Sequence, residues 1–303
     1  MNLIQVPDTY TEEHINADRL GGMIPLFDKR IEELIHNLKT KNIEFLDHTL
    51  MTLKENVGAD LFERFKHDFT NHLKSSMYNH LTGFDAFEEV NIIAGCTQFF
   101  DDLYVMNNEI QVLRDEYKYH ELINPNLQYK TIESLRAHVP LVISLPFSFH
   151  GREHPDMDTI LEECLERYIP VHIDSAWIPA SKDICFNYDH PAIHSFAISM
   201  SKGYGTAGWN RIGLRWKRKR NGSDTINTLK DYHQITTYPV AVGLYFLDNL
   251  LPDHLWATHK ERNEKICKDF GLTQTKAIHM ARKGEINYGL SPLIRYLEYN
   301  GGC

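Results

Sequence analysis

One stretch of the sequence decides the fold: Ser199-Met200-Ser201-Lys202-Gly203-Tyr204-Gly205-Thr206-Ala207-Gly208-Trp209-Asn210-Arg211-Ile212-Gly213. It begins where a predicted strand ends, and it combines a lysine with hydroxyl side chains, glycines and an arginine. Hydroxyl and guanidinium groups can hold a phosphate. An isolated loop lysine is usually a solvated surface residue. The neighbouring Ser199 and the glycine-rich turn indicate instead that Lys202 has a chemical role.

Strands and helices alternate around this stretch. Short apolar runs predict strands at 90–94, 110–113, 141–145, 171–177, 195–199 and 212–216, and helical spacing predicts helices at 97–106 and 156–168. Such alternation with short links is typical of a mainly parallel sheet sandwiched by helices. The predicted fold class is therefore α/β, and ligands belong at the carboxyl ends of the strands.

Helical patterns flank this α/β region. Amphipathic stripes predict helices within 24–38, 45–53 and 61–73, and a longer helical pattern follows Tyr238-Pro239. The last part of the chain gives only weak signals. We expect an N-terminal helical segment at 1–84, a large domain at 85–258 and a small, reduced C-terminal domain at 259–303.

Composition and charge exclude several classes of function. The net charge of -9 argues against nonspecific binding of nucleic acid, which needs a basic surface. The five cysteines are scattered without the CxxC pairing of a zinc site, so we expect no metal and a reducing compartment. The start of the chain lacks the pattern of a signal peptide, and no apolar run is long enough to span a bilayer. We therefore expect a cytoplasmic protein without a membrane partner.

The stretch from Ser199 to Gly213 resembles the S-x-S-K-x-x-G-x-x-G-x-R-x-G signature of class I and II aminotransferases. These enzymes, of the aspartate-aminotransferase type and fold type I, use pyridoxal 5'-phosphate (PLP). The resemblance implies that Lys202 carries PLP as a Schiff base and later moves the α-proton, while Ser199 and Arg211 contact the phosphate. Arg211 lies one residue farther from Lys202 than in the signature, so the turn must absorb an insertion.

An aspartate ends the predicted strand in Val171-His172-Ile173-Asp174-Ser175-Ala176-Trp177. A buried carboxylate needs a partner, although an isolated aspartate here would more often be an N-cap or turn residue. The segment is similar to the D-x-A-Y box of the aminotransferases. This implies that Asp174 pairs with the protonated pyridine nitrogen of PLP. Trp177 replaces the usual tyrosine, and it offers an indole N–H in place of a phenolic hydroxyl.

A glycine joins a predicted strand to a predicted helix in Ala94-Gly95-Cys96-Thr97-Gln98. The N-terminus of a helix suits a phosphate because of its free N–H groups and its dipole. Such turns are common, and Thr97 could be a simple N-cap. The segment resembles the phosphate cup of the family, which implies that Gly95, Cys96 and Thr97 hold the phosphate, with Gln98 as a further candidate.

Two more positions correspond to the PLP ring. Tyr117 lies where the family often has an aromatic side chain stacked on the ring, and packing in the core is the alternative. The segment Leu145-Pro146-Phe147-Ser148-Phe149-His150-Gly151 occupies the place of the family's N-P-N-N-P-T-G loop. Ser148 therefore stands where an asparagine binds the O3' oxygen of PLP, and its hydroxyl can donate one hydrogen bond. With Ser148 and Trp177 both altered, we expect the imine pKa to differ from that of a standard transaminase.

The resemblance covers residues 85–265, and the chain beyond residue 265 is shorter than the usual small domain of the family. That domain supplies the arginine that binds the substrate α-carboxylate, and Arg295 is the remaining candidate. The family also implies a homodimer with a shared active site. Tyr78 is the candidate for a residue that reaches the phosphate of the neighbouring subunit, with local packing as the alternative.

The implied function is an aminotransferase that acts on a small-molecule amino donor and a keto acid. Fold and cofactor do not determine the reaction, so a PLP-dependent lyase or decarboxylase is an alternative. A PLP-fold binding or regulatory protein with reduced catalysis is another, suggested by Ser148, Trp177 and the short C-terminus. The sequence identifies neither the amino donor nor the keto acid.

Overall fold

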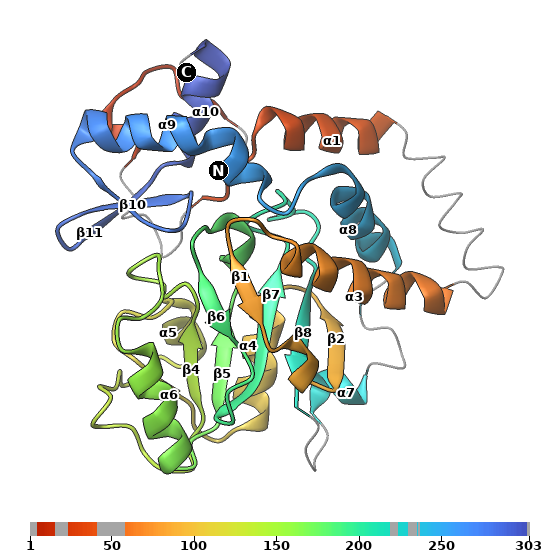
Figure 1. Ribbon diagram of the computed structural model, residues 1–303, viewed down its shortest axis with the longest axis vertical. Helices are drawn as coiled ribbons and strands as arrows, with labels where there is room; N and C mark the ends of the chain where they lie inside the picture. Colours follow the sequence, from red (N-terminus) through yellow and green to blue (C-terminus); the bar gives the residue numbers. More distant parts are fainter. Residues whose placement is uncertain are drawn as a thin grey trace.

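The structure is a computed structural model that describes residues 5–15, 24–40, 58–218, 224–229, 235 and 237–301. The helix expected at 45–53 lies outside these residues. A six-stranded sheet occupies the centre of the described part (Figure 1). Its strands run in the order β2 (Glu89–Ile93), β8 (Gly213–Lys217), β7 (Ile193–Ser199), β5 (Val171–Asp174), β4 (Leu141–Ser144) and β3 (Gln111–Val112).

All strands of this sheet except β8 point the same way. β8 is antiparallel to both β2 and β7, and the remaining neighbours pair in parallel. Because β2 and β7 both oppose β8, the carboxyl ends of β2, β3, β4, β5 and β7 meet at one edge of the sheet. That edge is where an α/β protein builds its ligand site.

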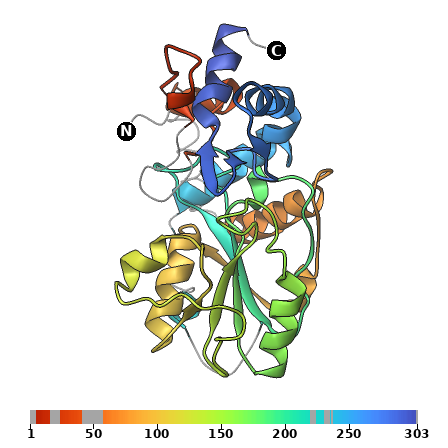
Figure 2. The same cartoon turned by 90° about the vertical axis from the view of Figure 1, so that its left-hand side faces the viewer.

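Helices cover both faces of the sheet (Figure 2). On one face lie α4 (Cys96–Met106) and α5 (Tyr119–Ile123), and on the other lie α3 (Gly58–Lys74) and α6 (Met157–Glu166). The side chains of the strands alternate between the two: Val142 and Ala197 join the core under α4, whereas Ile143 and Phe196 join the larger core opposite. Burial on both faces explains why these strands are continuous apolar runs. The predicted α/β fold class is confirmed.

The two ends of the chain pack together beyond this edge of the sheet (Figure 1). The N-terminal part supplies α1 (Lys29–Thr40). The C-terminal part supplies α9 (His254–Phe270), α10 (Ser291–Asn300) and a small antiparallel sheet of β9 (Thr273–Gln274), β10 (Met280–Lys283) and β11 (Ile286–Gly289). The weakly patterned end of the sequence is thus an ordered hairpin and helix. Its strands are too short to give a clear periodicity.

Two short strands and two helices connect these parts of the described structure. β1 (His80–Thr82) pairs in parallel with β6 (Cys185–Asn187), apart from the central sheet. α7 (Thr225–Thr228) begins at Asp224, whose side chain accepts a hydrogen bond from the backbone N–H of Asn227. α8 (Thr237–Asn249) packs on α3.

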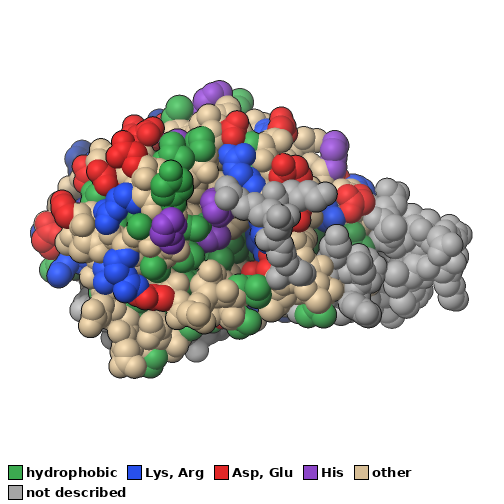
Figure 3. Space-filling view, turned by 90° about the horizontal axis from the view of Figure 1, so that it is seen from below, with side chains coloured by type: hydrophobic (Ala, Val, Ile, Leu, Met, Phe, Trp, Pro, Cys, Tyr) green, Lys and Arg blue, Asp and Glu red, His purple; other side chains and the backbone are tan. Residues whose placement is uncertain are grey.

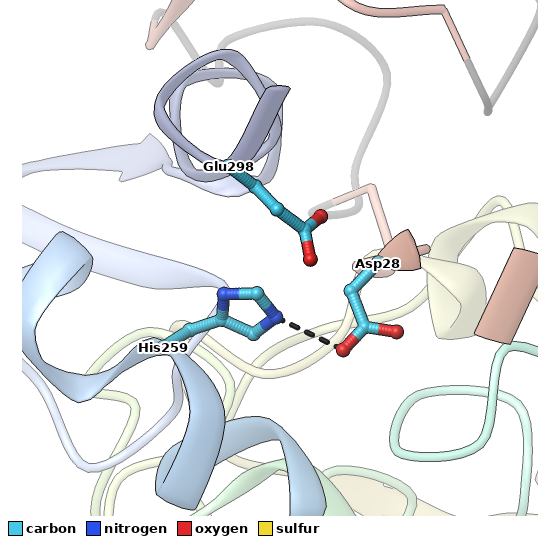
Figure 4. Close-up of side chains that lie close together, drawn as sticks. All are labelled: Asp28, His259 and Glu298. Atoms are coloured by element: carbon cyan, nitrogen blue, oxygen red, sulfur yellow. Dashed lines mark hydrogen bonds and ion pairs between the residues drawn. The ribbon is translucent and has the colours of Figure 1, made fainter. Parts of the chain in front are cut away.

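Asp28 fixes the contact between the two ends of the chain (Figure 4). Its Oδ1 accepts the backbone N–H of Ile31 at 2.8 Å, which caps α1 and explains why this helix begins at Lys29 and not at residue 24. Its Oδ2 accepts from Nε2 of His254 at 2.6 Å and of His259 at 3.0 Å. Burial raises the pKa of Asp28, but these hydrogen bonds outweigh burial and hold the pKa well below its ordinary value.

The surface that faces away from this junction carries mixed charges. Seen from below, acidic, basic and apolar side chains are interspersed over the coloured atoms (Figure 3). Nucleic-acid binding relies on clustered positive charge, so the described side chains of this face do not form such a surface. None of the helices within the described ranges combines the length and apolar composition that crossing a bilayer would require.

Candidate active site

The register of the sheet brings the expected residues to one edge. Ser144 of β4 is paired with Asp174 of β5, and Asp174 with Ala197 of β7. Gly95 follows β2 directly, and Lys202 lies in the turn after β7. Segments that are far apart in the sequence therefore meet where these parallel strands end.

Lys202 is held beside an aromatic ring and a carboxylate. Its Nζ lies 5.0 Å from the centroid of the Trp177 ring, within the range of a cation–π contact. Burial lowers the pKa of Lys202 to about 8 and the Arg211 charge adds to this, while the charge of Asp174 opposes it. With that pKa, about one Lys202 amine in ten is uncharged at pH 7. For an ordinary lysine the uncharged fraction is below about one in a thousand.

Asp174 ends β5 with a buried carboxylate. Its Oδ1 accepts the backbone N–H of Ala176 at 3.1 Å. Burial raises the pKa of Asp174 to about 6, against the opposing effects of the Cys96 thiol, the Ala176 N–H and the Lys202 charge. A cationic partner closer to Asp174 would stabilise its ionised form and lower this pKa.

Gly95, Ser199 and Arg211 lie together at the start of α4. Gly95 has φ 76° and ψ 173°, a conformation that suits glycine. A methyl group placed there would lie 3.6 Å from Nη2 of Arg211 and 3.8 Å from Cβ of Ser199. Arg211 donates from Nε to the carbonyl oxygen of Ala94 at 3.3 Å and from Nη2 to the hydroxyl of Thr97. The arrangement places a guanidinium, two hydroxyls and a helix N-terminus together.

Gly95, Thr97, Ser199 and Arg211 thus form a cup at the start of α4, and the side chains near it point in different directions. Ser199 is buried, and its hydroxyl lies 2.5 Å from that of Ser201. Gln98 turns back to accept the backbone N–H of Ala94 at 2.7 Å. The thiol of Cys96 lies against the sheet, 3.6 Å from the carbonyl oxygen of Ala197, and burial raises its pKa well above the ordinary value. Cys96 therefore presents its backbone, and not its thiol, to the start of α4.

Tyr117 faces the same edge. It is half-buried, stacks on Tyr119 with ring centroids 6.1 Å apart, and approaches Phe100 at 6.2 Å. Burial raises the pKa of Tyr117, and the charges of Asp174 and Arg211 both act on it.

Ser148 is connected to a buried carboxyl group. Its backbone N–H donates to Oγ of Ser144 at 2.9 Å, and the two hydroxyl oxygens are 3.2 Å apart. Ser144 in turn donates from Oγ to Oε2 of Glu116 at 2.6 Å. Sequence patterns gave no sign of this link between Glu116 and Ser148.

His279 is a second residue that sequence reasoning missed. It is fully buried, and its ring packs edge-on against Trp177 with centroids 4.9 Å apart. Burial and the Lys202 charge lower the pKa of His279 to about 3, so it is neutral. It precedes β10 in the weakly patterned part of the chain, where no motif marks it.

Two expected residues engage partners elsewhere. Arg295 is buried in α10, with Nη2 at 2.6 Å from Oε1 of Glu32, and its guanidinium lies over the ring of Tyr299. Tyr78 is half-buried against the main apolar core, and its carbonyl oxygen accepts the N–H of Asp183 at 2.8 Å. The roles expected of Arg295 and Tyr78 remain predictions.

Asp28, His259 and Glu298 form one group of metal-ligand type within the described chain, with ligand atoms all within 4.8 Å of one another (Figure 4). Nη1 of Arg262 lies 3.2 Å from Nδ1 of His259. Since arginine only donates, Nδ1 accepts and the proton is on Nε2, which donates to Asp28. A metal-binding histidine shows the opposite arrangement, with its second nitrogen donating. The group is therefore a hydrogen-bonded anchor.

Comparisons with known proteins identify the fold. No protein-family model matches the sequence, and no curated protein sequence is significantly similar. Histidinol-phosphate aminotransferase from Clostridium acetobutylicum superposes with a TM-score of 0.57 at 12% identity, covering 95% of this chain and 98% of that one. A Methanococcus jannaschii protein with an active site similar to that of kynurenine aminotransferases gives 0.56 at 14%, covering 85% of each chain.

Alanine aminotransferase from Pyrococcus furiosus gives a TM-score of 0.55 at 14% identity, covering 78% of this chain and 71% of that one. The chain thus has the fold of the PLP-dependent aminotransferases, fold type I. At these identities the similarity defines the fold and leaves the reaction to the chemistry of the site.

Proposed function

We propose that the chain binds PLP at this edge of the sheet and acts as an aminotransferase. One observation carries the proposal: a half-buried lysine with a lowered pKa, a buried carboxylate with a raised pKa and a guanidinium-lined cup all lie where the parallel strands end. The residues fit PLP, because each of its polar groups finds a counterpart of suitable chemistry.

The phosphate belongs in the cup. Arg211 supplies charge and hydrogen bonds, Ser199 and Thr97 supply hydroxyls, and the start of α4 supplies backbone N–H groups from Gly95 onward. Because Gly95 carries no Cβ, a phosphate oxygen would be free to approach its backbone between Arg211 and Ser199. Cys96 contributes its backbone here, and its buried thiol excludes water beneath Asp174.

Asp174 is the partner of the ring nitrogen. A protonated pyridine nitrogen would stabilise the carboxylate whose pKa burial now raises. PLP supplies an electron-withdrawing ring that stabilises negative charge at the substrate carbon next to the amine. Tyr117 covers one side of the ring, Trp177 orients the Lys202 amine, and Ser148 offers a hydroxyl to the phenolic oxygen O3'.

Lys202 acts as nucleophile and as proton carrier. Its lowered pKa leaves enough uncharged amine to bond covalently to an aldehyde carbon at neutral pH. With a substrate amine in that place, Nζ of Lys202 would be free to take the proton from the substrate α-carbon and hold it for transfer. Asp174 favours this transfer by keeping the ring cationic.

A spectral screen of amino donors tests the reaction type. An aminotransferase converts the visible band of bound PLP to that of the pyridoxamine form and releases one keto acid per site, and a second keto acid reverses the change. A lyase or decarboxylase releases product without that lasting change. Lys202→Ala is the matched control, which should give neither. If no amino donor changes the spectrum although PLP is bound, the binding-protein alternative replaces this proposal.

We further propose a homodimer that shares its active sites. Met77, next to Tyr78, is 90% exposed, so this segment is accessible to a second subunit. Sedimentation at micromolar concentration tests the dimer. Mixing Lys202→Ala chains with Tyr78→Phe chains tests the sharing, because hybrids would regain one intact site and exceed both parents in activity. A fully active monomer would refute both parts.

We propose Arg295 as the ligand of the substrate carboxylate, a role that requires its ion pair with Glu32 to break. The guanidinium now forms an ion pair with Glu32 at 2.6 Å and lies over the ring of Tyr299, at the contact between α10 and α1. A substrate carboxylate would have to replace Glu32 as its partner. KM values for the amino donor, measured on variants at both positions, decide between the two roles.

A further inference from the structure

A chain of three hydrogen-bonded side chains leads from the proposed cofactor site into the interior. Ser148 is half-buried at the site, whereas Ser144 is 2% exposed and Glu116 is 5% exposed. Oγ of Ser144 lies 3.2 Å from Oγ of Ser148 and 2.6 Å from Oε2 of Glu116. The proposed reaction does not use Glu116, so this buried carboxyl needs another explanation.

We propose that Glu116, acting through Ser144, sets the direction of the Ser148 hydroxyl and so determines whether Ser148 donates a hydrogen bond to the phenolic oxygen of PLP. The inference rests on the proposed function. It makes Glu116 and Ser144 positioning residues, because only Ser148 would touch the cofactor.

Each hydroxyl has a single proton, so the state of Glu116 decides where the protons of both serines point. When Glu116 is ionised it can only accept, so Ser144 donates to it and leaves its lone pairs to the N–H and the hydroxyl of Ser148. The Ser148 proton then points inward. When Glu116 is protonated it donates to Ser144, the Ser144 proton turns to Ser148, and the Ser148 proton is available to the cofactor oxygen.

Glu116 is balanced between these states. Burial raises the pKa of Glu116 to about 7, against hydrogen bonds from Ser144 and from the backbone N–H of Tyr117, while the charge of Asp174 adds to the rise. The titratable groups that face it are Asp174 of β5, Tyr117 on its own segment and Tyr129 in the loop beyond α5.

An anionic phenolic oxygen nearby would raise the pKa of Glu116 further. Bound PLP would therefore favour the protonated carboxyl, and with it a Ser148 that donates. That hydrogen bond compensates for the asparagine and tyrosine which Ser148 and Trp177 replace relative to the signature of the resembling family.

The test is a pH titration of the visible absorption band of bound PLP in four proteins. Glu116→Gln keeps the shape of the side chain, and its amide donates permanently to Ser144. Ser144→Ala interrupts the series of hydrogen bonds between Glu116 and Ser148 while keeping the carboxyl group of Glu116. Asp115→Asn is the matched control, since it removes a neighbouring exposed charge at a left-handed position that asparagine tolerates.

We expect wild type and Asp115→Asn to titrate in two coupled steps, one of them above pH 7, because the phenolic oxygen of bound PLP would raise the pKa of Glu116 from its value of about 7. Glu116→Gln should lose that step, and Ser144→Ala should lose it and shift the remaining midpoint by about one pH unit. An infrared carboxyl signal that titrates above pH 7 in the PLP-bound wild type should disappear in Glu116→Gln and persist in Ser144→Ala.

The outcomes separate the two proposals. If PLP attaches to Lys202 but Glu116→Gln titrates like wild type, the inference fails and the proposed function stands. If Glu116→Gln does not fold, an unchanged titration of Ser144→Ala overturns the inference by itself. If PLP does not attach to Lys202 at all, both proposals fall.

Discussion

Replacing Gly95 with alanine separates strain from ligand binding. With φ 76° and ψ 173°, a residue that carries Cβ is strained, which lowers the free energy of unfolding by about 1–3 kcal/mol. The methyl itself fits, since its nearest neighbours are 3.6 Å and 3.8 Å away on Arg211 and Ser199. A phosphate oxygen bonded to Arg211 would occupy the same space. Losing that charge-assisted hydrogen bond costs about 1.5–3 kcal/mol, or about 10- to 150-fold in PLP affinity.

Absorption titration with PLP measures the affinity, and denaturant unfolding measures the stability. Gly271→Ala is the matched control: Gly271 has φ 63° at the end of α9, and an added methyl there meets no atom within 4 Å. It should lose about 1 kcal/mol of stability and keep its PLP affinity. If Gly95→Ala binds PLP as tightly as wild type, or if both variants weaken binding equally, the cup is not the phosphate site.

Three further predictions concern the framework around the site. Arg215 is 2% exposed and forms ion pairs with Asp102 at 3.2 Å and Asp224 at 2.9 Å. Arg215→Leu should therefore lower the free energy of unfolding, measured by urea titration, by about 3–5 kcal/mol. A loss below about 1 kcal/mol would contradict this. Because the pKa of Asp28 is lower in the folded than in the unfolded protein, its contribution to stability is present above about pH 4 and is lost as the pH falls. In Asp28→Asn the free energy of unfolding should therefore fall less steeply at acid pH, and a fall as steep as in wild type would contradict the role of Asp28 as an anchor. Arg295→Met should lower stability by about 2 kcal/mol or more and raise KM for the amino donor at least about tenfold, whereas Glu32→Gln should lower stability with little change in KM; an unchanged KM in Arg295→Met would limit Arg295 to its contact with Glu32.

The sequence was informative where burial and chemistry coincide locally. β4 and β7 are largely apolar because both of their faces are covered; Asp174 ends the neighbouring strand β5, and Lys202 lies three residues beyond β7. The parallel direction of β5 and β7 was enough to predict that the two residues meet. The motif around Lys202 then supplied the candidate chemistry.

Contacts between distant segments could not be predicted from the sequence. Asp28 accepts hydrogen bonds from His254 and His259, which follow it by more than two hundred residues, so no local pattern relates them. Glu116 and Ser144 are 28 residues apart, and their contact depends on how the loop after β3 folds back onto the end of β4. His279 reaches Trp177 only because the C-terminal hairpin packs over the site.

Borohydride reduction of the PLP-loaded protein, followed by peptide mapping, tests the central claim most directly. Reduction fixes the pyridoxyl group on the amine that carries PLP. We predict a single modified peptide, labelled at Lys202, which is absent from Lys202→Ala and weakened in Asp174→Ala because the ring nitrogen has lost its counter-ion. A pyridoxyl group on another lysine, or no labelled peptide at saturating PLP, would contradict the account.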